Sequence, residues 1–307
     1  MRRVLHPSNF VRRSVPLSKQ SRKIFKVTAG PYTLELGKRT RIMGIVNLTP
    51  DSFSGDGCLT RSRGGVQKAA ALAETMVREG ADLLDLGGES TRPGSRRVCV
   101  AEEIRRVIPV VKALAQRIKI PLSVDTYKTI VAQHALDAGA VIINNIMGTK
   151  KNKSLLKMVR DYDAAIVLMH IRGIPSTMQR DVVYRSLFEE IAESLEKSIE
   201  NCLEIGIRSD RIIIDPGLGF GKGVEHNLQI INRLKYLSRL NQPILIGASR
   251  KSFIGKVLNQ DGSGRLWGSL ACVCAGILNG AHIFRVHDVC QTKQIAVMTD
   301  AIINETG

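Results

Sequence analysis

The feature that most constrains this chain is a short apolar run, rich in Ile, Val and Leu, that recurs eight times and ends each time at polar or charged residues. A segment with the apolar spacing of an amphipathic helix follows each run, so the pattern predicts eight strand-then-helix units. Such units are typical of the α/β class and of a closed (β/α)8 TIM barrel, whose strand ends form one catalytic mouth. The runs span residues 42–46, 81–84, 120–124, 141–143, 164–169, 212–214, 244–246 and 281–286.

The 307 residues divide unevenly between an N-terminal extension and one domain. We expect residues 1–23 to be a basic, disordered extension and residues 24–307 to form a single barrel domain, since such barrels need about 250 residues. Residues 24–36 read as two short strands around Gly30 and Pro31, which predicts a hairpin able to plug the N-terminal end of the barrel. Deletion to roughly residue 30 is therefore expected to leave activity intact.

The net charge of +17 is concentrated at the N-terminus. Residues 1–34 contain eight Lys or Arg and no Asp or Glu, and subtracting these eight leaves +9 for the remainder. A basic barrel suits small anionic substrates, whereas the extension alone also suits nucleic-acid binding or organelle import. The aromatic content of 4% argues against a base-stacking surface, and no apolar run is long enough to span a membrane.

The six cysteines are scattered, and neither a CxxC pair nor a Cys/His metal-binding spacing occurs. This usage indicates reduced, structural thiols in a cytoplasmic protein.

Two of the run ends carry groups suited to a phosphate-bearing substrate. Asn47 offers a neutral oxygen that can bind Mg²⁺ without cancelling its charge, although an Asn before Pro50 can equally form a turn. Arg92 lies in the Gly-rich segment 87–94 and offers a planar fork to phosphate oxygens.

The sixth run ends at Asp215, which begins the segment Asp-Pro-Gly-Leu-Gly-Phe-Gly-Lys, residues 215–222. Its spacing matches neither the dinucleotide-binding nor the P-loop motif, so we interpret the glycines as letting the backbone approach a flat ligand. A carboxylate deep in a pocket can accept two parallel hydrogen bonds from a guanine-like edge. The alternative for Asp215 is a helix cap.

The last two run ends add a cationic cluster. Residues 249–252 read Ser-Arg-Lys-Ser and residues 285–288 read Arg-Val-His-Asp. Together with Arg92 they oppose only two deep anions, Asp125 and Asp215. Neither a Ser/His/Asp triad nor a carboxylate pair is evident, and His170 fits a structural role as well as a catalytic one.

These motifs resemble those of dihydropteroate synthase in order and approximate spacing, over about residues 36–300. The combination of Ser-Arg-Lys-Ser with Arg-Val-His-Asp separates this family from pterin-binding relatives on the same barrel. The segments that carry the resemblance are residues 47–54, 89–94, 123–126, 143–146, 215–222, 249–252 and 285–288.

The resemblance implies a transferase of folate biosynthesis that condenses 6-hydroxymethyl-7,8-dihydropterin diphosphate with 4-aminobenzoate, giving 7,8-dihydropteroate and diphosphate. The aromatic amine is already neutral and nucleophilic, so no strong general base is needed, and an SN1-like departure of diphosphate is favoured. Catalysis should then come from stabilising the leaving group and aligning the amine. The resemblance further implies Mg²⁺, small-molecule substrates, a homodimer and competition by sulfonamides.

Residue roles are implied by position within the motifs. The catalytic group would be Lys251, Asp215, Arg92, Asn47 and His287, with Asn47, Arg92 and His287 on the diphosphate and Asn47 also on Mg²⁺. The pterin would be held by Asp125, Asn144, Asp215, Lys251, Arg285 and Met169. The 4-aminobenzoate pocket would consist of Thr91, Pro93, Phe53, Phe220, Ser249 and Ser252.

The chain departs from the family pattern twice. Residues 55–57 read Gly-Asp-Gly where Asp-Gly-Gly is commoner, so the role of Asp56 stays open. Asn145 stands where an Asp is usual and is not assigned.

Two rival functions make different demands. A pterin-dependent methyltransferase on the same barrel would keep the pterin edge but would not need Lys251, Arg92 and a diphosphate cluster. A basic nucleic-acid-binding scaffold would depend on residues 1–26 and not on the barrel mouth.

Overall fold

The computed structural model describes residues 22–49, 63–90, 95, 97–148, 152–173, 177–179 and 182–305. Six residues that are discussed above lie outside the described residues, namely Pro50, Phe53, Asp56, Thr91, Arg92 and Pro93.

Parallel strands form the centre of the described chain, in the order β8-β7-β6-β5-β4-β3-β10-β9. A parallel bridge between Ile214 and Ile244 joins the two ends of this sheet, so it closes into a barrel. The predicted α/β class and TIM barrel are confirmed. The strands are β3 (Arg41–Asn47), β4 (Leu83–Gly87), β5 (Leu122–Asp125), β6 (Ile142–Asn145), β7 (Ala165–Met169), β8 (Ile212–Asp215), β9 (Leu245–Ile246) and β10 (Ile283–Val286).

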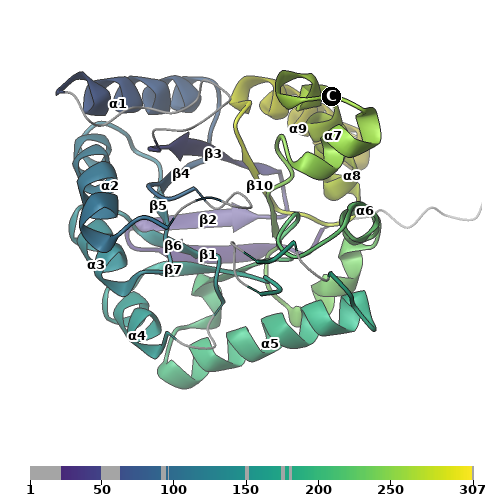
Figure 1. Ribbon diagram of the computed structural model, residues 1–307, viewed down its shortest axis with the longest axis horizontal. Helices are drawn as coiled ribbons and strands as arrows, with labels where there is room; N and C mark the ends of the chain where they lie inside the picture. The colour runs from purple at the N-terminus through teal and green to yellow at the C-terminus, as the bar shows by residue number, and fades with distance from the viewer. Residues whose placement is uncertain are drawn as a thin grey trace, which may run out of the picture.

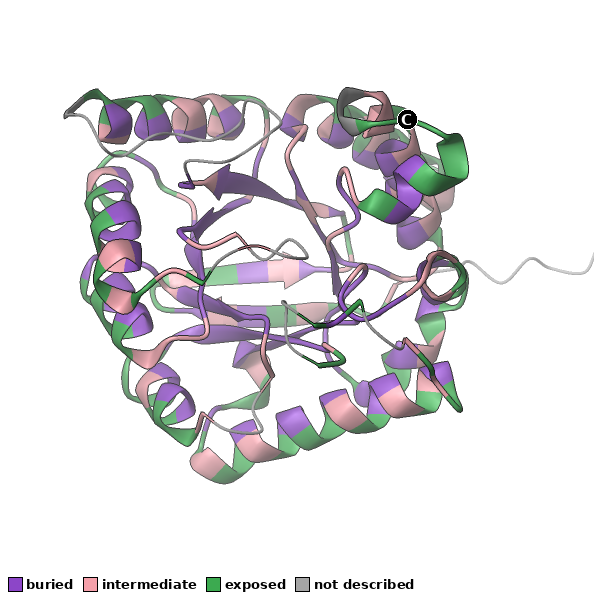
Figure 2. Cartoon of the chain, viewed as in Figure 1, coloured by how far each residue is buried: buried purple, intermediate pink, exposed green. Residues whose placement is uncertain are grey.

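Helices surround the strands, so the strands are buried on both faces and read as continuous apolar runs (Figures 1 and 2). Each helix turns a buried stripe toward the sheet and an exposed stripe outward, as Figure 2 shows clearly for α5. The helices are α1 (Arg63–Arg78), α2 (Val100–Ala115), α3 (Thr129–Asp137), α4 (Lys153–Asp161), α5 (Leu187–Ile205), α6 (Val224–Asn232), α7 (Ser252–Leu258), α8 (Leu266–Leu278) and α9 (Val289–Asn304). Among the described residues, no helix combines the length and apolar character needed to cross a membrane.

Some predicted boundaries were wrong, and one helix was missed. The second strand does not end at Asp85 but continues to Gly87, which turns the Asp85 side chain into the barrel. Residues 226–240, which the sequence pattern predicts as one helix, do not form one, because α6 ends and a 3₁₀ helix, η2 (Leu234–Leu240), follows it. The buried leucines of η2 recur every third residue, the spacing of a 3₁₀ turn. The short helix α7, of only 7 residues, is not predicted by the sequence pattern.

The predicted hairpin exists and closes the N-terminal end of the barrel. Strands β1 (Phe25–Ala29) and β2 (Tyr32–Leu36) pair antiparallel, and Gly30 makes the turn with a φ of 52°. Val27 and Leu36 are buried in one apolar cluster with Met43 and Leu83, which belong to barrel strands. Figure 1 shows the hairpin lying across the barrel.

The boundary expected for the N-terminal extension falls too late. Arg22, assigned to the extension, is an anchor of the barrel: its Nη2 lies 2.5 Å from Asp300 Oδ1 and its Nη1 donates to Thr40 Oγ1 at 2.7 Å. A deletion to residue 30 would remove this ion pair and all of β1. A deletion to residue 30 is therefore not expected to keep full activity.

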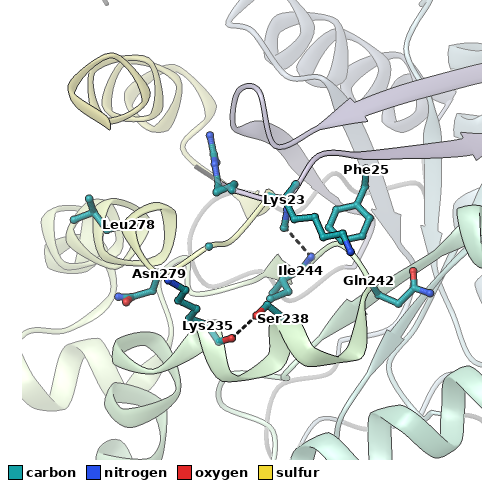
Figure 3. A pocket seen from close by; sticks show the side chains of 11 residues that line it. Lys23, Phe25, Lys235, Ser238, Gln242, Ile244, Leu278 and Asn279 are labelled. Carbon is teal, nitrogen blue, oxygen red and sulfur yellow. Dashed lines mark hydrogen bonds between the residues drawn. The ribbon is translucent and has the colours of Figure 1, made fainter. Parts of the chain in front are cut away.

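A pocket of about 220 Å³ opens beside the hairpin (Figure 3). Its lining includes Phe25, Ile244 just before β9 and His282 just before β10. The pocket therefore lies at the N-terminal end of the barrel, opposite the predicted site. Arg22 lines it, but its charge is engaged by Asp300.

Candidate active site

A buried ion network occupies the C-terminal mouth of the barrel. Arg285 on β10 donates from Nε to Asp85 Oδ2 at 2.5 Å and from Nη2 to Asp125 Oδ2 at 3.0 Å. Asn144 Nδ2 donates to the same Asp85 oxygen at 3.1 Å, and Ser123 Oγ donates to Asp85 Oδ1 at 2.6 Å. Asp85 thus joins three of the predicted pterin ligands, Arg285 and Asn144 directly and Asp125 through Arg285.

The network keeps charge inside the barrel. Burial raises the pKa of Asp125 to about 7, although Arg285 attracts its ionised form; the neighbouring Asp85 raises that pKa further. Burial also lowers the pKa of Arg285, but Asp85 and Asp125 outweigh it and the net shift is upward. Arg285 is therefore a permanent cation, and Asp125 is a carboxyl whose charge responds to what binds beside it.

Asp215 ends β8 and faces the same cations. Its Oδ1 accepts a hydrogen bond from the Gly217 N–H at 2.7 Å. Burial raises the pKa of the Asp215 carboxyl, against Gly217 N–H and the positive charges of Lys251, Lys222 and Arg285. The charges of Lys251 and Arg285 also act on Asp125, so both acids interact electrostatically with the same two cations.

The glycines after Asp215 also have a reason within the fold, beside the interpretation that they admit a flat ligand. Gly217 has a φ of +70°, and a Cβ there would lie 2.0 Å from the carbonyl oxygen of His170. A Cβ on Gly219 would meet the side chain of Lys251 at 3.2 Å. These positions need glycine because left-handed backbone and close neighbours leave no room for a side chain.

Lys251 lies beside the ring of Phe220, with Nζ 4.2 Å from the ring centroid. Phe220 packs in a small apolar cluster with Met169, Ile146 and Met178. A cation, an aromatic ring and an apolar wall therefore stand next to Asp215, a set suited to a flat polar heterocycle.

A second polar group joins residues at or just after the ends of β3, β9 and β10. Asn47 Nδ2 lies 3.3 Å from His287 Nε2, and Ser249 Oγ lies 3.0 Å from His287 Nδ1. The backbone N–H of His287 also donates to Ser249 Oγ at 3.2 Å. Ser249, expected in the aminobenzoate pocket, is thus a direct neighbour of a predicted diphosphate ligand. Ser252 begins α7 and is exposed.

The residues present would fit a magnesium ion held mainly by the phosphate oxygens of a ligand. Within the described residues no group of three or more His, Cys, Asp or Glu could hold a metal. Mg²⁺ usually keeps several waters and takes phosphate oxygens, so one amide oxygen from Asn47 is an adequate protein contribution.

Two buried residues of the site were missed by sequence reasoning. The sequence pattern predicts Asp85 as the polar residue at which the second strand ends. The strand in fact continues to Gly87, so Asp85 is one of the strand residues that face the barrel interior. Lys222 was named only as the end of the glycine segment, yet it is 2% exposed and its Nζ lies 2.9 Å from His170 Nδ1.

Comparison with known proteins agrees with this geometry. Residues 43–287 match the family model described as pterin binding enzyme. The chain is similar to the dihydropteroate synthase of Synechocystis sp., with 43% identity over 89% of this chain and 93% of that protein.

Two solved structures are also similar. The Yersinia pestis dihydropteroate synthase in complex with a sulfonamide drug gives a TM-score of 0.86 at 40% identity, over 91% of this chain and 100% of that chain. The Xanthomonas albilineans dihydropteroate synthase with 4-aminobenzoic acid gives 0.82 at 37% identity, over 91% and 98%.

Proposed function

The chain belongs to the dihydropteroate synthases of the pterin-binding enzyme family, and we propose that its barrel mouth joins 6-hydroxymethyl-7,8-dihydropterin diphosphate to 4-aminobenzoate. The amine nitrogen bonds to the methylene carbon, the bond from that carbon to the diphosphate oxygen breaks, and the nitrogen then releases a proton. The observation that carries the proposal is the meeting of Asp215 and Lys251 with the Arg285 network in one mouth.

Asp215 would accept the paired N–H groups of the pterin edge, and Lys251 would donate to the ring-oxygen side. Asp125 and Asn144 would complete the polar rim of this site. Arg285 would orient Asp125 directly and Asn144 through Asp85. Met169 would pack on the ring, with Phe220 nearby in the same apolar cluster. The interior position of these groups excludes water, which strengthens each hydrogen bond.

Departure of diphosphate is the costly step, and cations near the leaving oxygens would lower its barrier. Arg92 and His287 would bind these oxygens, with Ser249 fixing the His287 ring through its Nδ1 contact. Asn47 would hold Mg²⁺, which supplies positive charge to the diphosphate when bound.

The 4-aminobenzoate would enter beside the leaving group. Thr91, Pro93 and Phe53 would line its pocket with Phe220, Ser249 and Ser252. The solved Xanthomonas relative with 4-aminobenzoic acid supports this substrate, and the Yersinia relative with a sulfonamide supports competition by such drugs.

We also propose a homodimer formed through the α7–α9 surface. Large apolar side chains are exposed there, including Trp267 at 76% and Ile302 at 63%. Such a patch is typical of an interface between subunits.

The described cysteines are free thiols, which supports a cytoplasmic location. Residues 1–21 would be a dispensable extension of the single barrel domain.

The deciding experiment incubates the protein with the pterin diphosphate, 4-aminobenzoate and Mg²⁺ and follows dihydropteroate and diphosphate. Equimolar release of both is expected, with loss of the reaction on chelation of magnesium. A folded protein that forms no dihydropteroate would refute the proposal. Methyl transfer from a methylated folate to a corrinoid protein would favour the methyltransferase instead.

A further inference from the structure

Lys222 is a buried cation that the proposed reaction does not use. Its Nζ lies 2.9 Å from His170 Nδ1, 3.0 Å from the carbonyl oxygen of Phe220 and 3.4 Å from that of His170. An ammonium group has three N–H donors, so the two carbonyls, together with His170 Nδ1 in the tautomer that leaves this nitrogen unprotonated, match its full capacity.

Both ends of the loop formed by residues 215–222 are fastened to His170 at the end of β7. The backbone N–H of His170 donates to the carbonyl of Asp215 at 2.9 Å, which fixes the start of the loop. Gly217 abuts the His170 carbonyl, and Lys222 returns to the same residue at the other end of the loop. Phe220 is held between, since its carbonyl accepts from Lys222 while its ring faces Lys251.

Neutral contacts hold the outer side of this loop. Asn227 on α6 accepts from the Gly219 N–H at 2.7 Å and donates to the carbonyl of Gly223 at 2.6 Å. Tyr184 donates its hydroxyl hydrogen to the carbonyl of Gly221 at 2.9 Å. Lys222 differs from these residues because it also carries charge.

That charge acts on Asp215. Burial lowers the pKa of Lys222 to about 7, with Asp215 opposing the shift and Lys251 adding to it. Reciprocally, Lys222 is among the cations that counter the burial-driven rise in the pKa of Asp215. The titratable and charged groups that face Lys222 are His170 just after β7, Asp215 on β8 and Lys251 before α7.

We propose that Lys222 is a positioning residue of the pterin site, which ties the Asp215 loop to β7 and sustains the anionic form of Asp215. The inference rests on the proposed function, because it assumes that Asp215 binds the pterin edge. It predicts that Lys222 acts on pterin binding more than on 4-aminobenzoate binding.

The test compares Lys222→Met, which keeps the stem without the charge, with Lys222→Arg, which keeps the charge. Lys235→Met, at an exposed lysine of η2, is the matched control. Circular dichroism and thermal unfolding check the fold. Calorimetric titration with the pterin diphosphate, without 4-aminobenzoate, measures affinity across the pH range in which Asp215 titrates, and steady-state kinetics give kcat and both KM values.

In Lys222→Met the affinity for the pterin diphosphate should fall by about tenfold or more, while the KM for 4-aminobenzoate stays within about twofold. Loss of a neighbouring cation raises the pKa of Asp215, so pterin affinity should begin to fall at a higher pH than in the wild type. Lys222→Arg should restore the wild-type acid limb, and Lys235→Met should leave every value unchanged.

A folded Lys222→Met protein with wild-type pterin affinity and acid limb would overturn the inference. If that variant does not fold, Lys222→Gln, which retains hydrogen-bond donors, decides by the same two criteria; failure of both to fold would assign Lys222 to stability alone and overturn the inference too. Wild-type protein is assayed first, because absence of dihydropteroate there would reject the proposed function itself.

Discussion

The two ends of the barrel are built from the same strands but hold opposite kinds of side chain. On β4, Leu83 lies in the apolar cluster that the hairpin closes, whereas Asp85, two residues later, lies in the ion network of the mouth. On β10, Ile283 and Arg285 repeat the pattern. Residues i and i+2 point to the same side of a strand. Two residues along the same strand therefore separate an apolar interior position from a charged one.

This difference separates stability from chemistry. The N-terminal end stabilises the folded state by removing apolar surface from water. The buried charges of the mouth lower that stability unless they are paired. Substitutions at the two ends should therefore have different signatures in activity and in the free energy of unfolding.

The largest effect is expected at the mouth. Lys251→Ala and Asp215→Asn should each abolish product formation, a loss of about 10³-fold or more, because each removes an electrostatic contact to the substrate. Both should fold normally, since Asn can keep the hydrogen bond from Gly217 and Lys251 is only partly buried. Steady-state assays beside Lys256→Ala, an exposed lysine of α7, make the comparison. Unaltered kcat/KM in either variant would contradict the site.

Arg285→Met should damage both properties. It leaves Asp85, which is 0% exposed, without its cation, and breaking a buried pair in this way costs about 3–5 kcal/mol. Urea unfolding measures the loss, and pterin binding should fall with it. Adding Asp85→Asn to Arg285→Met should recover part of the stability but not the activity; a double variant no more stable than Arg285→Met would show that the pair is not the cause.

Leu36→Ala probes the opposite end. The Leu36 side chain is fully buried against the N-terminal ends of the barrel strands. Its truncation should therefore lower the free energy of unfolding by about 2–5 kcal/mol. The kcat of the folded fraction should not change, because the mouth is untouched. A selective loss of kcat would mean that the two ends are coupled.

His282 should make the N-terminal end sensitive to acid. Its Nδ1 accepts from the Ile244 N–H at 3.1 Å, and burial lowers its pKa to about 4 from an ordinary 6.5. The unfolded chain binds this proton more tightly, so the stability is complete above about pH 6.5 and is lost as the pH falls toward 4. The loss at pH 5 should be about 2 kcal/mol. His282→Gln should flatten this slope in pH-dependent urea unfolding, whereas His134→Gln, at an exposed position, should not.

The smallest effect is expected from removing residues 1–21. The deletion keeps Arg22 and its pair with Asp300, so the free energy of unfolding and kcat should match those of the full chain within error. Loss of activity on this deletion would revive the view that the basic extension carries the function. Binding of nucleic acid that disappears with it would do the same.

Sequence reasoning recovered the barrel because buried parallel strands are continuous apolar runs. It also predicted that Asp215 and Lys251 lie at the mouth, because each directly follows such a run or the turn after it. It missed Asp85 because periodicity cannot say where an apolar strand stops when a charged residue belongs to its buried face. Lys222 was missed for another reason. Its burial depends on a loop that folds back onto His170, a contact between residues 52 apart in sequence that local patterns do not encode.

The joint between β8 and β9 is the thinnest part of the wall, since β9 has only 2 residues and a single bridge, Ile214 to Ile244, crosses it. Asp215 stands on one side of this joint and Lys251 on the other. A pterin ring bound by both residues would link the two strands across this joint. The substrate-free enzyme should therefore open locally at this joint first, and substrate binding should slow amide hydrogen exchange in β8 and β9. Substrate would then complete the cylinder as well as react within it.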